Sequence, residues 1–212
     1  MLRVCEIFKS IQGESSFAGN LCTFVRLSGC NLACSWCDTA YAREEPGREM
    51  SVEQITEEVN KYSIKLVEIT GGEPLLQAET SKLCQELLQQ GYTVLVETNG
   101  SQNINLLPSG VRRIVDVKCP GSGAGNSFLM DNLETLESCD EIKFVISSLG
   151  DAAWAQMFMK ENELQKICSV IFSPVADQLE PKKLAEWIVD RELDVRMGLQ
   201  LHRIIWGDRR GV

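Results

Sequence analysis

One stretch of the chain decides how the rest is interpreted: Cys30-Asn31-Leu32-Ala33-Cys34-Ser35-Trp36-Cys37-Asp38-Thr39. It holds three of the nine cysteines, at the spacing C-x3-C-x2-C. A segment this short can direct three sulfur atoms at one small object, and thiolates favour zinc or an iron–sulfur cluster. The spacing predicts a metal centre and leaves its kind open.

The number of ligands bears on that choice. A structural zinc site normally has four protein ligands. The fourth would be another cysteine or His202, the single histidine, and there is no second C-x2-C pair. A redox pair made of Cys34 and Cys37 would leave Cys30 unexplained. A 4Fe–4S cluster held by three cysteines keeps one iron open for a further ligand, which accounts for the odd number.

Length and composition narrow the class of protein. A chain of 212 residues, 44% of them hydrophobic, predicts a single domain, residues 1–212, with an ordinary core. The net charge of −9 argues against a nucleic-acid partner, and no apolar run reaches the roughly 20 residues of a membrane span. Without a signal peptide pattern, a cytoplasmic location with reduced thiols is expected. Five further cysteines are expected to be small buried hydrophobic residues: Cys5, Cys22, Cys84, Cys139 and Cys168.

Strand patterns alternate with helix patterns along the chain. Strands are predicted at residues 4–8, 22–27, 66–70, 93–98, 114–117, 141–146 and 169–172. Helices are predicted from Ser51, around 83–88, at about 152–163 and at 181–189. The segments between these elements are predicted to be a loop at 9–16, a connector at 43–49 and a mobile glycine-rich loop at 121–126. An extended segment is predicted at 193–201 and a tail at 206–212. This order predicts an α/β fold with a parallel sheet, whose ligands gather at the carboxyl ends of the strands.

Unusual residues fall at those strand ends. They are Thr70-Gly71-Gly72-Glu73, Glu97-Thr98-Asn99, Lys118 and Ser173. Arg26 lies inside an apolar strand and needs a partner. An internal ion pair and a bound ligand are both open on the sequence, and its position four residues before Cys30 favours the ligand.

The three cysteines, with Trp36 before the last of them, resemble the signature of the radical S-adenosylmethionine (SAM) superfamily. The sequence Thr70-Gly71-Gly72-Glu73-Pro74 resembles its GGE motif. The resemblance implies an incomplete, modified (β/α) barrel of the radical SAM type. It also implies a 4Fe–4S cluster whose open iron binds SAM, and a 5′-deoxyadenosyl radical that abstracts hydrogen from the substrate.

Five segments, at 6–14, 24–32, 36–39, 96–100 and 200–203, resemble the 7-carboxy-7-deazaguanine synthase family. The implied reaction rearranges 6-carboxy-5,6,7,8-tetrahydropterin to 7-carboxy-7-deazaguanine with loss of ammonia, on the route to queuosine. A homodimer, and a reductant such as flavodoxin or ferredoxin, are implied as well. Residues 121–193 resemble the family least.

The same resemblance assigns residues to ligands. Cys30, Cys34 and Cys37 would hold the cluster, and Thr39 a Mg²⁺ ion. SAM would be contacted by Trp36, Cys37, Asp38, Gly72, Glu73, Glu97, Lys118 and Ser173. The pterin would be contacted by Ile11, Gln12, Gly13, Glu14, Arg26, Thr70, His202 and Val212. Many relatives carry Ser-Pro-Lys where this chain has Val117-Lys118-Cys119, and Cys119 is expected not to ligate, since a fully coordinated cluster could not bind SAM.

The sequence leaves plainer roles open for several of these residues. Trp36 and His202 could be core residues, Thr39 a helix cap, Lys118 a surface charge and Glu97 an ion-pair partner. The alternative enzyme is a radical SAM activase that generates a glycyl radical on a partner protein. A different class would be an iron–sulfur electron carrier or a zinc-stabilised module, which would leave the GGE motif without a purpose.

Overall fold

The computed structural model describes residues 1–212, and its centre is one nine-stranded sheet. The strand order is β3-β1-β2-β4-β5-β6-β7-β8-β9. The strands are β1 Leu2–Ile11, β2 Leu21–Leu27, β3 Arg48–Met50, β4 Leu66–Gly71, β5 Thr93–Thr98, β6 Arg112–Asp116, β7 Glu141–Ile146, β8 Ser169–Pro174 and β9 Arg196–Met197. From β2 to β9 every neighbouring pair is parallel, while β1 is antiparallel to both β2 and β3. The predicted α/β fold is confirmed.

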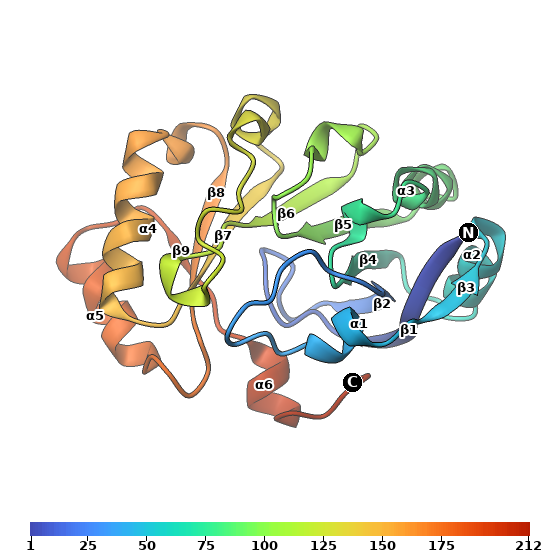
Figure 1. The fold of residues 1–212 in the computed structure, drawn as a ribbon, viewed down its shortest axis with the longest axis horizontal. Coiled ribbons are helices and arrows are strands. Elements are labelled where there is room, and N and C mark those ends of the chain that lie inside the picture. The colour runs from blue at the N-terminus through green and yellow to red at the C-terminus, as the bar shows by residue number, and fades with distance from the viewer.

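Four of the helices lie at the two ends of the sheet, and α6 lies apart from them (Figure 1). In Figure 1, α2 and α3 lie at one end of the sheet and α4 and α5 at the other, while α6 lies near the end of the chain. The helices are α1 Ala40–Glu44, α2 Val52–Asn60, α3 Thr80–Gln89, α4 Leu149–Glu161, α5 Pro181–Asp190 and α6 Leu201–Trp206. Short 3₁₀ helices are η1 Pro74–Leu76, η2 Ile104–Leu106, η3 Pro120–Ser122, η4 Met130–Thr135 and η5 Leu164–Lys166. No helix combines the length and the apolar character that crossing a membrane requires.

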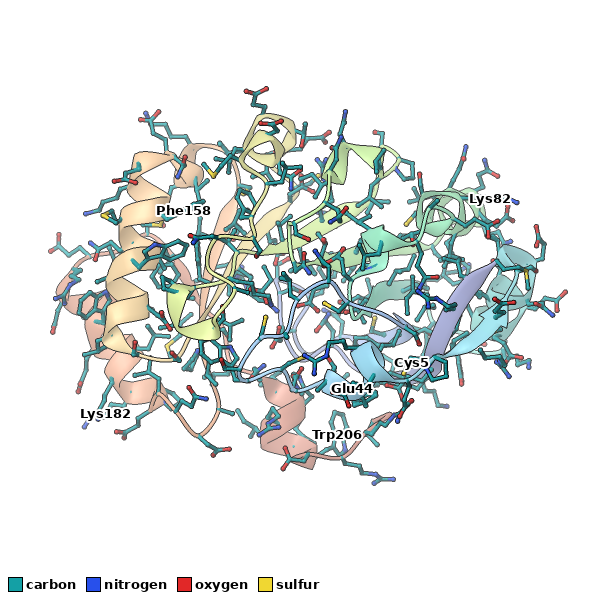
Figure 2. The ribbon with its side chains drawn as sticks, viewed as in Figure 1. Cys5, Glu44, Lys82, Phe158, Lys182 and Trp206 are labelled. Carbon is teal, nitrogen blue, oxygen red and sulfur yellow. The ribbon has the colours of Figure 1, made fainter.

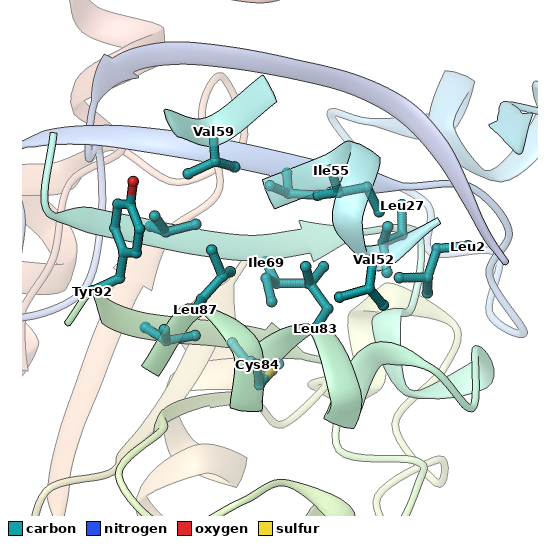
Figure 3. Close-up of a cluster of buried hydrophobic side chains, with 14 of the residues drawn as sticks. Leu2, Leu27, Val52, Ile55, Val59, Ile69, Leu83, Cys84, Leu87 and Tyr92 are labelled. Carbon is teal, nitrogen blue, oxygen red and sulfur yellow. The ribbon is translucent and has the colours of Figure 1, made fainter. Parts of the chain in front are cut away.

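Alternation along the strands separates the core from the functional face. Val67 and Ile69 of β4 pack into a core with α2 and α3, to which Ile55 and Leu83 contribute (Figure 3). Burying each such side chain stabilises the fold by roughly 1.5–3 kcal/mol. Because successive side chains of a strand point to opposite faces, Glu68 and its equivalents on neighbouring strands face away from this core.

Helix α2 begins as the sequence predicts. The Ser51 hydroxyl accepts from the Gln54 backbone N–H, and the Gln54 side chain accepts from the Ser51 N–H. This reciprocal capping box satisfies donors that would otherwise be left open at the start of the helix.

Four boundaries predicted from the sequence are wrong. Strand β1 extends to Ile11, because residues 9–11 pair with residues 21–23 of β2. The 43–49 connector contains the end of α1 and the start of β3. The extended segment at 193–201 holds only the two residues of β9, and the chain turns helical at Leu201, so that His202 lies on α6. The glycine-rich 121–126 loop includes η3, and the Ser122 carbonyl accepts from the Ser35 N–H at 3.0 Å.

The cysteine prediction holds for three of the five residues. Cys22, Cys84 and Cys168 are buried, whereas Cys5 and Cys139 are partly exposed. The Cys5 thiol lies beside charged groups, with Glu45 as its hydrogen-bond acceptor at 3.6 Å. It is therefore not a core hydrophobe.

Candidate active site

A cavity of about 270 Å³ lies against the face of the sheet that points away from the α2–α3 core. It brings together all but two of the residues assigned from the sequence. Those lining it are Ile11, Gln12, Gly13, Glu14, Arg26, Cys30, Cys34, Trp36, Cys37, Asp38, Thr39, Thr70, Gly72, Glu97, Lys118, His202 and Val212. The cavity extends beyond the carboxyl ends of the strands where ligands were expected. Gln12, and Glu68 from the middle of β4, also line it.

The three cysteines lie on one loop at the cavity. Cys30 and Cys34 are half-buried and Cys37 is exposed. The Leu32 N–H donates to the Cys30 Sγ at 3.4 Å, and the Asn99 side-chain amide donates to the same atom at 3.8 Å. Donors of this kind favour a thiolate, the form that binds metal.

Electrostatics at these sulfurs have two opposing parts. Burial raises the pKa of the Cys30 and Cys34 thiols, and the nearby Lys118 ammonium works in the opposite direction. No three His, Cys, Asp or Glu side chains surround a point where a single metal ion would sit. The fit to a cluster rests on the shared loop, the thiolate donor set and these neighbouring donors.

The glycines of the GGE motif are required by packing against the cysteine loop. A Cβ at Gly72 would lie 2.1 Å from the Gly29 carbonyl oxygen, and one at Gly71 would lie 2.2 Å from that of Leu27. The Glu73 N–H donates to the Gly29 carbonyl at 2.8 Å. Only residues without a side chain allow this approach, which fixes the cysteine loop against the end of β4.

Two assigned residues, Glu73 and Ser173, do not line the cavity. The Glu73 carboxylate is fully buried and accepts from the Leu75 N–H at 2.9 Å, the Thr98 hydroxyl at 2.8 Å and the Asn99 N–H at 2.7 Å. It braces the ends of β4 and β5, and burial raises its pKa. Ser173 is buried against Gly198. Their predicted contacts with SAM stay a prediction.

A charged network lies at the centre of the cavity. The Lys143 ammonium pairs with Glu14 and Glu97, and lies 3.6 Å from the Asp116 carboxylate. Asp116 also holds the Lys118 ammonium at 2.8 Å. Burial lowers the pKa of Lys143, but the carboxylates outweigh burial and the pKa is raised well above its usual value. Lys143 therefore stays charged while buried.

Glu68 is the most enclosed carboxyl of the cavity. Only 2% of the residue is exposed, and its carboxyl accepts from the Gln12 side-chain amide. Burial, then the charge of Glu97, raises the pKa of Glu68 well above its usual value. The Gln12 carbonyl oxygen accepts from the Glu14 N–H at 2.7 Å, so the amide is held from both ends.

The sequence interpretation missed Glu68, Asp116 and Lys143 as site residues. The signal that identified Arg26, a charge inside an apolar strand, is also present in Leu66-Val67-Glu68-Ile69-Thr70 and in Glu141-Ile142-Lys143-Phe144. Applied to every strand, it would have found Glu68 and Lys143.

Arg26 has an internal partner and still lines the cavity. Its Nε donates to the Glu6 Oε1 at 2.9 Å, and its guanidinium lies 5.9 Å from the centroid of the Tyr41 ring. Burial lowers the pKa of Arg26, whereas its interactions with Tyr41 and Glu6 raise it. The net shift of the Arg26 pKa is upward. The two roles left open by the sequence are therefore compatible.

Asp38 and His202 both line the cavity and lie close to each other. The His202 Nε2 lies 3.5 Å from the Asp38 Oδ2. A Cβ at Gly13 would lie 2.3 Å from the His202 Nδ1, which explains the glycine there, and the Leu201 N–H donates to the Gly13 carbonyl at 3.0 Å. These contacts attach α6 to the 11–14 segment.

Thr39 occupies the N-cap position of α1, but its side chain makes no capping hydrogen bond. The hydroxyl lies 3.8 Å from the Cys37 Sγ and lines the cavity. The Thr39 hydroxyl therefore does not cap α1, which was the plainer role that the sequence left open.

Comparison with known proteins defines the class. The Radical SAM superfamily matches residues 24–117, a span that holds the three cysteines and the GGE motif, and that superfamily implies a 4Fe–4S cluster and SAM. The 7-carboxy-7-deazaguanine synthase of Koribacter versatilis is 46% identical over 97% of both chains. That of Chlorobaculum tepidum is 45% identical over 100% of this chain and 97% of its own. The chain belongs to the 7-carboxy-7-deazaguanine synthase family.

Solved structures agree on the fold. The crystal structure of QueE from Escherichia coli superposes with a TM-score of 0.78 at 23% identity, covering 94% of this chain and 93% of the other. Streptococcus suis SuiB bound to its precursor peptide SuiA superposes with a TM-score of 0.56 at 15% identity, covering 81% of this chain and 46% of the other. The predicted radical SAM type of fold is confirmed.

Proposed function

We propose that this protein converts 6-carboxy-5,6,7,8-tetrahydropterin to 7-carboxy-7-deazaguanine with loss of ammonia, in the biosynthesis of queuosine and other 7-deazapurines. One observation carries the proposal beyond family membership. The cysteine loop and a guanidinium suited to a carboxylate, that of Arg26, line the same cavity. An electron carrier needs no such anion site, and an activase has no small acidic substrate to place there.

The cysteine loop provides the residues proposed to bind the cluster and SAM. Cys30, Cys34 and Cys37 would hold the 4Fe–4S cluster, which together with SAM would supply the hydrogen-abstracting radical chemistry. The Cys30 sulfur receives the amide donors described above, and Lys118 adds a positive charge beside Cys34. Trp36, Asp38, Gly72, Glu97 and Lys118, which all line the cavity, are the residues proposed to contact SAM.

The strand network provides the residues proposed to bind the pterin. Arg26 binds the substrate carboxylate through a charge-assisted pair. Gln12 and Glu14 present an amide and a carboxylate to the donors and acceptors of the pterin ring. Lys143 joins Glu14, on the pterin side, to Glu97, on the SAM side. Both carboxylates are therefore held in place before ligands arrive, which reduces the ordering that the reaction requires.

Magnesium is proposed at Thr39. The hydroxyl is left free by the helix that it precedes, and a hard cation that keeps water and substrate oxygens needs few protein ligands. The ion would orient the substrate carboxylate and offset its charge. The resemblance also supports the remaining proposals: one radical SAM domain over 1–212, a homodimer, a cytoplasmic location and a flavodoxin or ferredoxin as reductant.

Anaerobic turnover tests the function. Cluster-reconstituted protein with dithionite, SAM and the carboxy-tetrahydropterin should yield 5′-deoxyadenosine and a deazaguanine product. The Arg26→Gln variant should lose the product, because the substrate carboxylate loses its partner, while its cluster spectrum stays unchanged. Formation of 5′-deoxyadenosine without any deazaguanine, at every pterin concentration, would contradict the proposal.

A further inference from the structure

Residues 207–212 follow α6, and the Arg210 side chain connects this segment to Glu6 and Glu45. Its guanidinium donates to both oxygens of Glu45, at 2.6 and 2.8 Å, and to the Glu6 Oε2 at 3.2 Å. It also lies 3.3 Å from the Cys5 Sγ and 4.0 Å from the centroid of the Tyr41 ring. Figure 2 shows Cys5 near this end of the chain.

These contacts connect Arg210 to Arg26. Glu6 uses Oε1 for the Arg26 Nε at 2.9 Å and Oε2 for the Arg210 Nε. The Tyr41 hydroxyl donates to the same Glu6 Oε1 at 2.7 Å, and its ring is near both guanidinium groups. Arg26 is thus held by a carboxylate and a phenol that Arg210 in turn holds in place.

The charges of this group matter for an anionic ligand. Arg26 and Arg210 balance Glu6 and Glu45. Without Arg210 the group would carry one excess negative charge beside the guanidinium that has to accept a carboxylate. Both arginines line the cavity, whereas Glu6 and Glu45 are not among the residues that line it.

Resting on the function proposed above, we propose that Arg210 is a positioning residue for the substrate carboxylate. It acts through Glu6 and Tyr41, which set the direction of the Arg26 side chain, and it cancels the negative charge behind Arg26. Its own side chain is 41% exposed, so its ion pairs contribute little to folding. The effect falls on substrate affinity, which separates this role from a structural one.

The test compares kinetics of the reconstituted holoenzyme. Arg210→Ala should raise the KM for the carboxy-tetrahydropterin about tenfold or more, since charged hydrogen bonds are lost around Arg26. The KM for SAM and the melting temperature should change little, and the yield of deazaguanine per 5′-deoxyadenosine should fall. Arg210→Lys should recover part of the loss. Arg191→Ala, which removes a surface guanidinium stacked on Trp187, is the matched control and should behave as wild type.

A double-mutant cycle tests the route of the effect. If Arg210 acts through Glu6, adding Arg210→Ala to Glu6→Gln should raise the pterin KM by much less than it does in the wild type. Fully additive effects, or an unchanged pterin KM in Arg210→Ala, would overturn the inference and leave the proposed function standing. A wild type that forms no deazaguanine would overturn the proposed function and the inference with it.

Discussion

The cysteine loop and the charged strand network border one cavity but are built in opposite ways. In the loop, Cys37 is exposed, and the hydroxyl of Thr39 makes no capping bond. In the network, Glu68 and Lys143 are 2% and 3% exposed and bonded within the protein. We expect bound groups to complete the loop, whereas the ion pairs of the network are already formed within the protein. Changes in the loop should cost activity alone, whereas changes to the buried ion pairs of the network should also cost stability.

The largest expected effect is in the loop. Cys34→Ala should reduce 5′-deoxyadenosine and deazaguanine to background, because the cluster loses one of three ligands. Its free energy of unfolding without metal should match that of the wild type, since Cys34 is only half-buried. Anaerobic assays, iron analysis and urea denaturation measure these outcomes. SAM cleavage surviving in Cys34→Ala would mean that the cluster is held elsewhere.

The next effect is in the network. Lys143→Met leaves Glu14, Glu97 and Asp116 without their shared cation, so the free energy of unfolding should fall by about 3–5 kcal/mol. The control is Lys166→Met, which breaks an exposed pair with Glu163 and should cost at most about 1 kcal/mol. Urea denaturation gives both values. Equal losses in the two variants would refute the claim that the buried network stabilises the fold more than an exposed ion pair does.

A smaller effect depends on pH. The folded-state pKa of Glu68 is raised, so wild-type stability falls as pH rises from the unfolded value of about 4.3 toward the folded one. Glu68→Gln removes this titration and keeps a polar partner for Gln12. Its stability relative to wild type should therefore improve from pH 5.5 to pH 7.5, by up to about 1.4 kcal/mol per pH unit. A difference between the two proteins that is independent of pH would contradict the pKa direction.

The smallest expected effect comes from a substitution at Thr39, at the edge of the cysteine loop. Thr39→Ala should weaken the dependence of turnover on Mg²⁺ and leave the cluster spectrum and melting temperature unchanged, because the hydroxyl caps no helix. Turnover across a magnesium titration measures it, with Thr39→Ser, which keeps the hydroxyl, as the control. Loss of the cluster spectrum in Thr39→Ala would assign this residue to the structure of the loop.

The sequence predicted the local patterns well. The cysteine spacing, the capping box at Ser51 and the alternation of strands and helices depend on neighbours in the chain. What it missed depends on contacts between distant residues. Lys143 meets Glu14 across 129 positions, and the brace role of Glu73 depends on Asn99 folding back onto it. His202 was placed on an extended segment because six residues of α6, none of them buried, give a weak helix pattern.

On the proposed function, a radical formed at the cysteine loop reaches a pterin held by the strand network. The most direct measurement uses carboxy-tetrahydropterin that carries deuterium on its saturated ring carbons. Deuterium should appear in the 5′-deoxyadenosine that is released during turnover, and the transfer should be lost in Arg26→Gln. Unlabelled 5′-deoxyadenosine from a wild-type enzyme saturated with this pterin would mean that the radical does not take hydrogen from the pterin.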